Sequence, residues 1–145
     1  MAAVKKIVLI EFTPAQMFDL VDRCEDYPKF LPWCGGSEVH HRDDRITRAT
    51  LHINYHGIKS HFSTENDKQY PTHMHIRLTD GPFTHLDGSW DFTALGEAAC
   101  KVEFNLRYEF SSRLIEKAVG PVFNHIANTF VDSFVKRAGQ IYGGK

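Results

Sequence analysis

The stretch Arg113–Tyr142, RLIEKAVGPVFNHIANTFVDSFVKRAGQIY, decides how the rest of the chain must fold. Its apolar residues recur in steps of three and four, which places them in one stripe along a helix. The predicted stripe comprises Val119, Val122, Phe123, Ile126, Ala127, Phe130, Phe134, Ala138 and Ile141. A helix this apolar needs a broad partner surface, and a curved sheet wrapped around it would supply one.

The ends of this helix carry recognisable signals. Ser111 or Ser112 can cap its start, and Gly143-Gly144 predict a left-handed stop. Gly120-Pro121 interrupts the pattern, so we expect a kink or a short break there. Near the other end of the chain, Thr13-Pro14-Ala15-Gln16 combines a cap, a first-turn proline and a capping-box glutamine, which predicts a short helix.

The remaining segments are mostly strands, in which apolar and polar residues alternate. A second short helical turn is expected over Asp26–Phe30, before Leu31-Pro32. The predicted strands are Ala3–Phe12, Ser37–Arg42, Ile46–His56, Ile58–Asn66, His73–Thr79, Phe83–Leu95 and Lys101–Phe110. This order of one strand, two short helices, six strands and a long helix indicates an α+β fold with an antiparallel sheet that is wet on one face.

Length and composition favour one reduced, cytoplasmic domain spanning residues 1–145. The net charge is −1, which argues against a nucleic-acid binder that works through bulk charge, and no specific DNA binding is expected. No apolar run reaches membrane-spanning length, so any membrane contact would be peripheral, at the inner membrane. The 3 cysteines are odd in number and not closely spaced, and ordinary thiols are the expectation.

The 9 histidines raise the hypothesis of a metal site. His52 and His56 share one strand face, as do His73 and His75, but these are the polar faces of their strands. A metal site needs three or four converging ligands with a supporting shell, so solvated surface histidines are the favoured interpretation and no metal is expected.

Two further surface or catalytic hypotheses are weaker than their structural alternatives. Arg42, Arg45 and Arg48 suggest a patch for phosphate, but Asp43 and Asp44 lie among them, and a solvated sheet face is favoured. No nucleophile with a base, no carboxylate pair and no glycine-rich phosphate loop has recognisable spacing. We therefore expect no catalytic residues, no enzymatic activity and no cofactor.

Aromatic residues are unusually dense in two loops. The segment Tyr27–Cys34, YPKFLPWC, is far more apolar than a connection needs to be. The same is true of Gly81-Pro82-Phe83, which leads to Trp90 and Phe92. These segments could close the ends of a core, or they could form the mouth of a cavity between sheet and helix. Both interpretations fit the sequence.

At these segments the chain resembles the START-like (helix-grip) superfamily, in its coenzyme Q-binding branch. That branch also contains bacterial proteins called ribosome association toxins and, earlier, oligoketide cyclase or lipid-transport proteins. The matching pieces are Tyr27–Cys34, then Asp80–Phe83 continuing through Leu86, Gly88, Trp90 and Phe92, and Phe134–Ala138. The similarity covers essentially the whole chain, and the order of elements is the one derived above.

The resemblance implies a seven-stranded curved antiparallel sheet around the long helix, with a hydrophobic tunnel between them. The implied ligand is ubiquinone, another polyisoprenoid quinone or a similar lipid, and the implied role is that of a carrier or chaperone for respiration. Each buried isoprene unit would contribute roughly 3–4 kcal/mol. Association costs about 4–15 kcal/mol, so roughly two to four buried units could suffice.

The tunnel that the resemblance implies has predicted wall and entrance residues. Phe30, Leu31 and Trp33 are the expected entrance. The expected ligand-binding wall comprises Leu51, Ile53, Tyr55, Phe83, Trp90, Phe92, Phe123, Ile126, Ala127, Phe130 and Phe134. The resemblance also keeps two alternatives open, a protein that binds the large ribosomal subunit and blocks translation initiation, and a cyclase-like enzyme. The near-neutral charge does not favour the ribosomal alternative.

Overall fold

The computed structural model describes residues 1–143. The helical elements are α1 (Pro14–Asp22), the 3-10 helix η1 (Cys24–Lys29) and the long α2 (Arg113–Tyr142). The strands are β1 (Ala2–Ile10), β2 (Cys34–Arg42), β3 (Ile46–Tyr55), β4 (Ile58–Gln69), β5 (His73–Asp80), β6 (Phe83–Ala94) and β7 (Cys100–Phe110). The predicted order of elements and the predicted bounds of α2 are confirmed.

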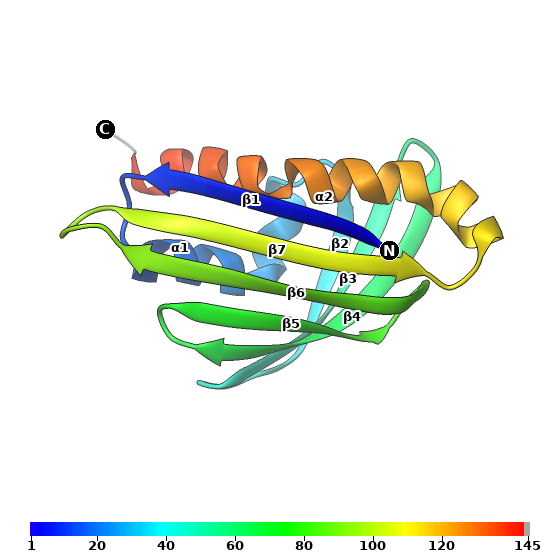
Figure 1. Ribbon diagram of the computed structural model, residues 1–145, viewed down its shortest axis with the longest axis horizontal. Coiled ribbons are helices and arrows are strands. Elements are labelled where there is room, and N and C mark those ends of the chain that lie inside the picture. Colours follow the sequence, from blue (N-terminus) through cyan, green and yellow to red (C-terminus); the bar gives the residue numbers. More distant parts are fainter. Residues whose placement is uncertain (144–145) are drawn as a thin grey trace.

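All seven strands form one antiparallel sheet in the order β1-β7-β6-β5-β4-β3-β2. Strands β2 to β7 follow one another as hairpins, and β1 joins the far end by pairing with β7. Figure 1 shows α2 lying along one face of this curved sheet, with α1 at one end of the molecule. The predicted helix-grip architecture is confirmed. No helix within residues 1–143 is long and apolar enough to cross a membrane.

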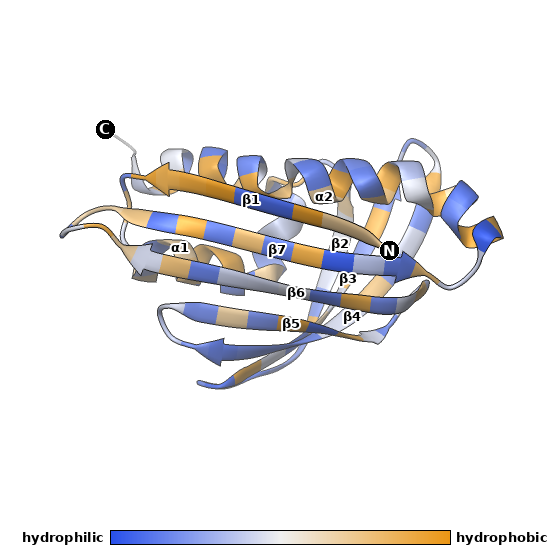
Figure 2. Cartoon of the chain, in the orientation of Figure 1, coloured by the Kyte–Doolittle hydropathy of each residue, from blue (hydrophilic) through white to orange (hydrophobic). Residues whose placement is uncertain are grey.

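Alternation of side chains fixes which face of the sheet meets α2. In β7, Val102, Phe104 and Leu106 are buried, whereas Glu103 and Asn105 between them are partly exposed. Figure 2 shows the corresponding change between hydrophobic and hydrophilic residues along this strand. Because successive side chains of a strand point to opposite faces, one face is apolar and buried and the other is wet.

The predicted capping signals are in place at both helix starts. The Thr13 side chain accepts from the backbone N–H of Gln16 at 3.1 Å, and the Gln16 side chain accepts from the backbone N–H of Thr13 at 2.8 Å. Ser112 caps α2 by accepting from the backbone N–H of Ile115 at 3.1 Å. Both reciprocal and single caps satisfy backbone donors that a helix start leaves free.

Helix α2 continues through Gly120-Pro121 without a break, and its first turns leave the axis of the rest, as expected for a kink (Figure 1). Two other details of α2 differ from the sequence-based expectation. Gly143 has φ −83°, so it does not provide the left-handed stop, and Gly144 lies outside the described residues. Ile141, predicted to belong to the buried stripe, is 45% exposed, while the unpredicted Val131 is 1% exposed.

Some strand bounds also differ. β1 ends at Ile10 because the chain bends before the Thr13 cap, so Phe12 is not part of the strand. β2 begins at Cys34 and β4 continues to Gln69, both longer than predicted. The second short helix spans Cys24–Lys29 in 3-10 geometry. Local propensity does not mark these bounds, because the ladder of the neighbouring strand extends them.

A glycine in the loop between β5 and β6 explains one of the sequence motifs. Gly81 has φ +147°, a conformation that L side chains rarely adopt. A Cβ atom at this position would lie 2.8 Å from the Cβ atom of Phe62, which is buried in β4. Gly81 therefore allows the turn to pack directly against the sheet before Pro82 and Phe83 start β6.

A charged cluster ties α1 to the sheet. Asp22, the last residue of α1, accepts a hydrogen bond from the Thr47 hydroxyl at 2.8 Å and from Lys68 Nζ at 3.0 Å. The Lys68 side chain is only 5% exposed. Arg42 adds a hydrogen bond from Nη2 to the Asp22 carbonyl oxygen at 2.7 Å and pairs with Glu25 of η1. The α1–η1 segment is thereby held against β2, β3 and β4.

Candidate functional site

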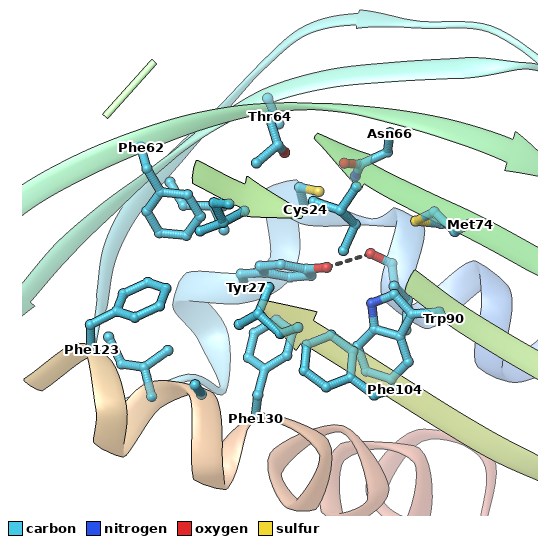
Figure 3. Close-up of a pocket in the computed structure, with 18 of the residues that line it drawn as sticks. Cys24, Tyr27, Phe62, Thr64, Asn66, Met74, Trp90, Phe104, Phe123 and Phe130 are labelled. Carbon is cyan, nitrogen blue, oxygen red and sulfur yellow. Dashed lines mark hydrogen bonds between the residues drawn. The ribbon is translucent and has the colours of Figure 1, made fainter. Parts of the chain in front are cut away.

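A cavity lies between the inner face of the sheet and α2 (Figure 3). The space open to the centre of a water-sized sphere is about 60 Å³. Its wall is almost entirely apolar. The lining residues are Val21, Cys24, Tyr27, Trp33, Ala49, Leu51, Phe62, Thr64, Asn66, Met74, Ile76, Leu86, Trp90, Phe104, Leu106, Phe123, Ile126, Ala127 and Phe130.

Local sequence patterns explain how α2 and the sheet contribute to this wall. In α2, Phe123, Ile126, Ala127 and Phe130 follow steps of three, one and three, which places them on one helix face. In the sheet, each contributing strand supplies residues two or four positions apart, such as Phe104 and Leu106 of β7. Figure 3 shows Phe123 and Phe130 projecting from the helix toward the strands.

Half of the residues predicted for the ligand site line this cavity. They are Trp33, Leu51, Trp90, Phe123, Ile126, Ala127 and Phe130. They come from the loop after η1, from strands β3 and β6, and from helix α2. Segments far apart in the sequence therefore meet here, as expected. Phe130 and Ile76 are the lining residues that keep partial exposure.

The other predicted residues pack outside the cavity. Phe134 is fully buried against Tyr27, with a ring-centroid distance of 5.3 Å. Phe83 packs on Phe123 at 4.8 Å. These two rings therefore belong to the core at either side of the cavity rather than to its wall.

The remaining predicted residues lie at the ends of the core. Phe92 packs against Phe18 of α1 with centroids 6.0 Å apart, and Tyr55 stacks on His125 at 5.7 Å. Ile53 is 2% exposed in β3. At the predicted entrance, Phe30 is half-buried, whereas Leu31 and Trp33 are 2% and 3% exposed. That entrance is therefore closed by its own side chains.

Strand β4 carries lining residues that were not predicted. Phe62, Thr64 and Asn66 lie two positions apart, so they share one face, and all three are buried. Strand alternation places Thr64 and Asn66 on the same side as the apolar Phe62, and this signal could have found them. Their polar side chains hid it. Tyr27 and Cys24 of η1 were likewise missed, because a 3-10 helix has no strand-like alternation.

The ionisable groups of the cavity are held in their neutral forms. Burial raises the pKa of the Cys24 thiol to about 12. Burial also raises the pKa of Tyr27 well above its usual value, and the Tyr27 hydroxyl donates to the Val21 carbonyl oxygen at 2.5 Å. Since a thiolate is the reactive form of cysteine, Cys24 is a poor nucleophile near neutral pH. Burial raises the pKa of Cys34 in the same way, as expected for an inert thiol.

Several histidines of the outer sheet face pair with carboxylates. His52 Nε2 lies 2.7 Å from Glu38, His73 Nδ1 lies 2.7 Å from Asp91, and other pairs follow the same pattern. Among residues 1–143, no group of three or more His, Cys, Asp and Glu side chains could hold a metal ion. These histidines are surface residues that share a face with acidic neighbours.

The arginines of the β2–β3 hairpin are also largely engaged. Arg42 pairs with Glu25 at 2.7 Å, and Arg48 donates from Nε to Glu65 at 2.7 Å. Glu65 also pairs with Arg77 of β5. Alternating charges therefore cross-link the outer face of the sheet, and these arginines do not form an isolated basic patch.

Comparison with known proteins gives consistent results. Residues 10–135 match the family model described as "Polyketide cyclase / dehydrase and lipid transport". The chain is 42% identical over 143 residues to the ribosome association toxin RatA of Vibrio cholerae, covering 99% of each chain. It is 30% identical over 141 residues to the mitochondrial coenzyme Q-binding protein COQ10 homolog B of Xenopus laevis, covering 93% of this chain and 57% of that protein.

The fold has solved counterparts. The crystal structure of TTHA0849 from Thermus thermophilus superimposes with a TM-score of 0.79 at 19% identity, covering 99% of this chain and all of the other. A START superfamily protein from Mycobacterium smegmatis superimposes with a TM-score of 0.73, also at 19% identity, over 96% of this chain and 98% of the other. Sequence and structure agree, and the chain belongs to the polyketide cyclase/dehydrase and lipid transport family, with a START-like fold.

Proposed function

We propose that this protein binds a hydrophobic small molecule, a polyisoprenoid quinone or related lipid, between the sheet and α2, and carries it without altering it. The observation that supports this proposal is the apolar cavity that separates α2 from the sheet. A well-packed domain of this size normally has few voids larger than a water molecule. A cavity lined by aromatic and aliphatic side chains offers favourable burial to a hydrocarbon chain.

The cavity must widen to take such a ligand. Small-molecule sites usually measure about 300–1,000 Å³, whereas the space in this state is about 60 Å³. One wall belongs to a single helix, α2, and another to η1, so a displacement of either element would enlarge the space. Such a carrier would exchange its ligand by peripheral contact with a membrane. The closed state would then be the state of the protein when it is away from the membrane.

The chemistry of the wall supports carriage rather than catalysis. Within the described chain, no Asp, Glu, Lys, Arg or His side chain lines the cavity. Cys24 and Tyr27 are the lining groups that could ionise, and burial disfavours their charged forms. General acid–base catalysis needs a group whose pKa lies near the working pH. The proposal therefore includes neither catalytic residues nor a resident cofactor.

Filling the cavity tests this proposal directly. Ala127 is 1% exposed and lines the cavity from α2. Protein purified from a quinone-producing host is expected to release a lipid on organic extraction, and native mass spectrometry should show the same mass bound. Ala127→Leu and Ala127→Trp are expected to reduce the bound fraction at least about tenfold, because their side chains occupy the ligand's place.

A matched control uses the neighbouring position. Asn128 is exposed on the same helix, so Asn128→Leu adds a similar apolar side chain outside the cavity. It should leave the bound fraction unchanged. Equal lipid in wild type and in both Ala127 variants, with all three folded, would contradict the cavity as the binding site.

A second candidate function is binding to the large ribosomal subunit. The supporting observation is the 42% identity to a protein named ribosome association toxin over almost the whole chain. We expect the protein to co-sediment with large subunits at low salt and to dissociate as salt rises, since contacts with RNA phosphates weaken with ionic strength. Sedimentation of Ala127→Trp separates the two functions, because a ribosome-binding surface should survive filling of the cavity. No co-sedimentation at any salt concentration would exclude this candidate.

A further inference from the structure

Two residues that line the cavity each have a buried polar atom with no hydrogen-bond partner within the part of the chain that the structure describes. These atoms are Nε1 of Trp33 and Oδ1 of Asn66. Both residues line the cavity and are nearly inaccessible to solvent, with exposed fractions of 3% and 6%. A buried polar group without a partner destabilises a folded protein, so each such group needs an explanation, and a ligand that pairs with it is one.

The surroundings of these atoms are mostly apolar. Trp33 packs against Phe130, with ring centroids 6.2 Å apart. Asn66 belongs to β4, and Figure 3 shows its carboxamide extending from the strand toward the cavity, near Thr64 on the same strand. The Tyr27 hydroxyl, by contrast, is already used in a hydrogen bond to the Val21 carbonyl oxygen. Trp33 and Asn66 are therefore polar groups of the wall that remain available to a ligand.

We infer that Trp33 and Asn66 form a polar subsite for the head group of the ligand, and that this head group is neutral and carries oxygen. This inference rests on the proposed carrier function. The indole N–H of Trp33 can only donate, so it requires an acceptor such as a carbonyl or hydroxyl oxygen. The unpaired Oδ1 of the Asn66 carboxamide can only accept, so it requires a donor such as a hydroxyl, while Nδ2 of the same carboxamide can donate to a ketone.

No charged side chain of the described residues lines the cavity, and this selects against ionic head groups. No cationic side chain is among the lining residues, so a carboxylate or phosphate would enter the cavity unpaired. Burying an unpaired charge costs far more than burying a hydrogen-bonded ketone. The subsite thus distinguishes neutral oxygenated lipids from fatty acids and phospholipids, while the apolar wall accepts the hydrocarbon tail of any of them.

Three probes with similar chains test the inference, namely 2-dodecanone, dodecanoate at pH 8, and dodecane. Affinities are measured by native mass spectrometry and by quenching of tryptophan fluorescence. Wild type is expected to bind 2-dodecanone more tightly than dodecane, and dodecanoate most weakly. Trp33→Phe and Asn66→Leu should each weaken 2-dodecanone binding roughly two- to tenfold, the value of one hydrogen bond, and leave dodecane binding unchanged.

Two controls keep the result interpretable. Asn105→Leu makes the same substitution on the outer face of β7 and should not change the affinity for any probe. Asn66→Leu should also raise the melting temperature of the ligand-free protein by a few degrees, because it removes an unpaired polar group from an apolar wall.

The outcomes separate this inference from the proposed function. Failure of wild type to bind any of the three probes would overturn the carrier function and the subsite together. Binding of dodecane and 2-dodecanone with equal affinity, unchanged in Trp33→Phe and Asn66→Leu, would overturn the subsite alone. Tighter binding of dodecanoate than of 2-dodecanone would also overturn it, because the head group would then be ionic.

Discussion

Replacement of Asp22 by alanine is expected to lower the free energy of unfolding by about 3–5 kcal/mol. The Asp22 carboxylate accepts hydrogen bonds from Lys68 Nζ at 3.0 Å and from the Thr47 hydroxyl at 2.8 Å. The Lys68 side chain is 5% exposed and Thr47 is fully buried. Without Asp22, the Lys68 ammonium would lose its closest counter-charge in a place that water hardly reaches. Urea unfolding of the variant and the wild type measures the difference.

Two comparison variants identify the cause of that loss. Asp26→Ala removes a carboxylate from a neighbouring ion pair with Lys29, whose side chain is 65% exposed, and should cost less than about 1 kcal/mol. Asp22→Ala combined with Lys68→Met should be more stable than Asp22→Ala alone, since the unpaired charge is then absent. If Asp22→Ala costs no more than Asp26→Ala, Lys68 must find water or another partner.

Phe134→Ala is expected to lower the free energy of unfolding by about 3–5 kcal/mol. Phe134 has no solvent exposure, and its ring lies within 5.4 Å of the ring centroids of Tyr27, Phe30, Trp90 and Phe130. Its removal would leave a hole in the most aromatic part of the core, where η1, the sheet and α2 meet. Thermal and urea unfolding measure the loss.

Phe130→Ala is the matched comparison, one helical turn earlier in α2. Phe130 is half-buried and already faces the cavity, so its truncation should cost under about 3 kcal/mol. Lipid retention should show the opposite order, because Phe130 lines the cavity and Phe134 does not. If folded Phe134→Ala loses more bound lipid than Phe130→Ala, the ligand must bind closer to η1 than the cavity described here.

The fold could be predicted because its signals are local and repetitive. The long stripe of α2, the alternation of β7 and the Thr13–Gln16 capping box each repeat or satisfy a backbone requirement within a few residues. Errors remained within the helix itself. Ile141 continues the helical pattern but is 45% exposed. Val131 lies four residues after Ala127 and three before Phe134, so the same spacing could have identified it as buried.

The cavity was harder to predict because it depends on what faces each residue across the core. Phe123 and Phe134 belong to the same helical stripe, yet one lines the cavity and the other fills the core. Which one faces open space depends on the curvature of the sheet and on where η1 packs. The periodicity of α2 gives no information on either. Thr64 and Asn66 show the converse, since their polarity concealed an inward orientation that strand alternation requires.

The pairing of β1 with β7 has a consequence for how the molecule folds. Strands β2 to β7 join by short hairpins, whereas Ile10 pairs with Cys100, about ninety positions along the chain. Closing so long a loop costs more entropy than closing a hairpin, and such non-local contacts slow folding. No residue of β1 lines the cavity in the described chain. The part of the cavity wall that the sheet supplies is thus built from locally paired strands, and the slow closure by β1 completes an edge of the sheet that contributes no described residue to that wall.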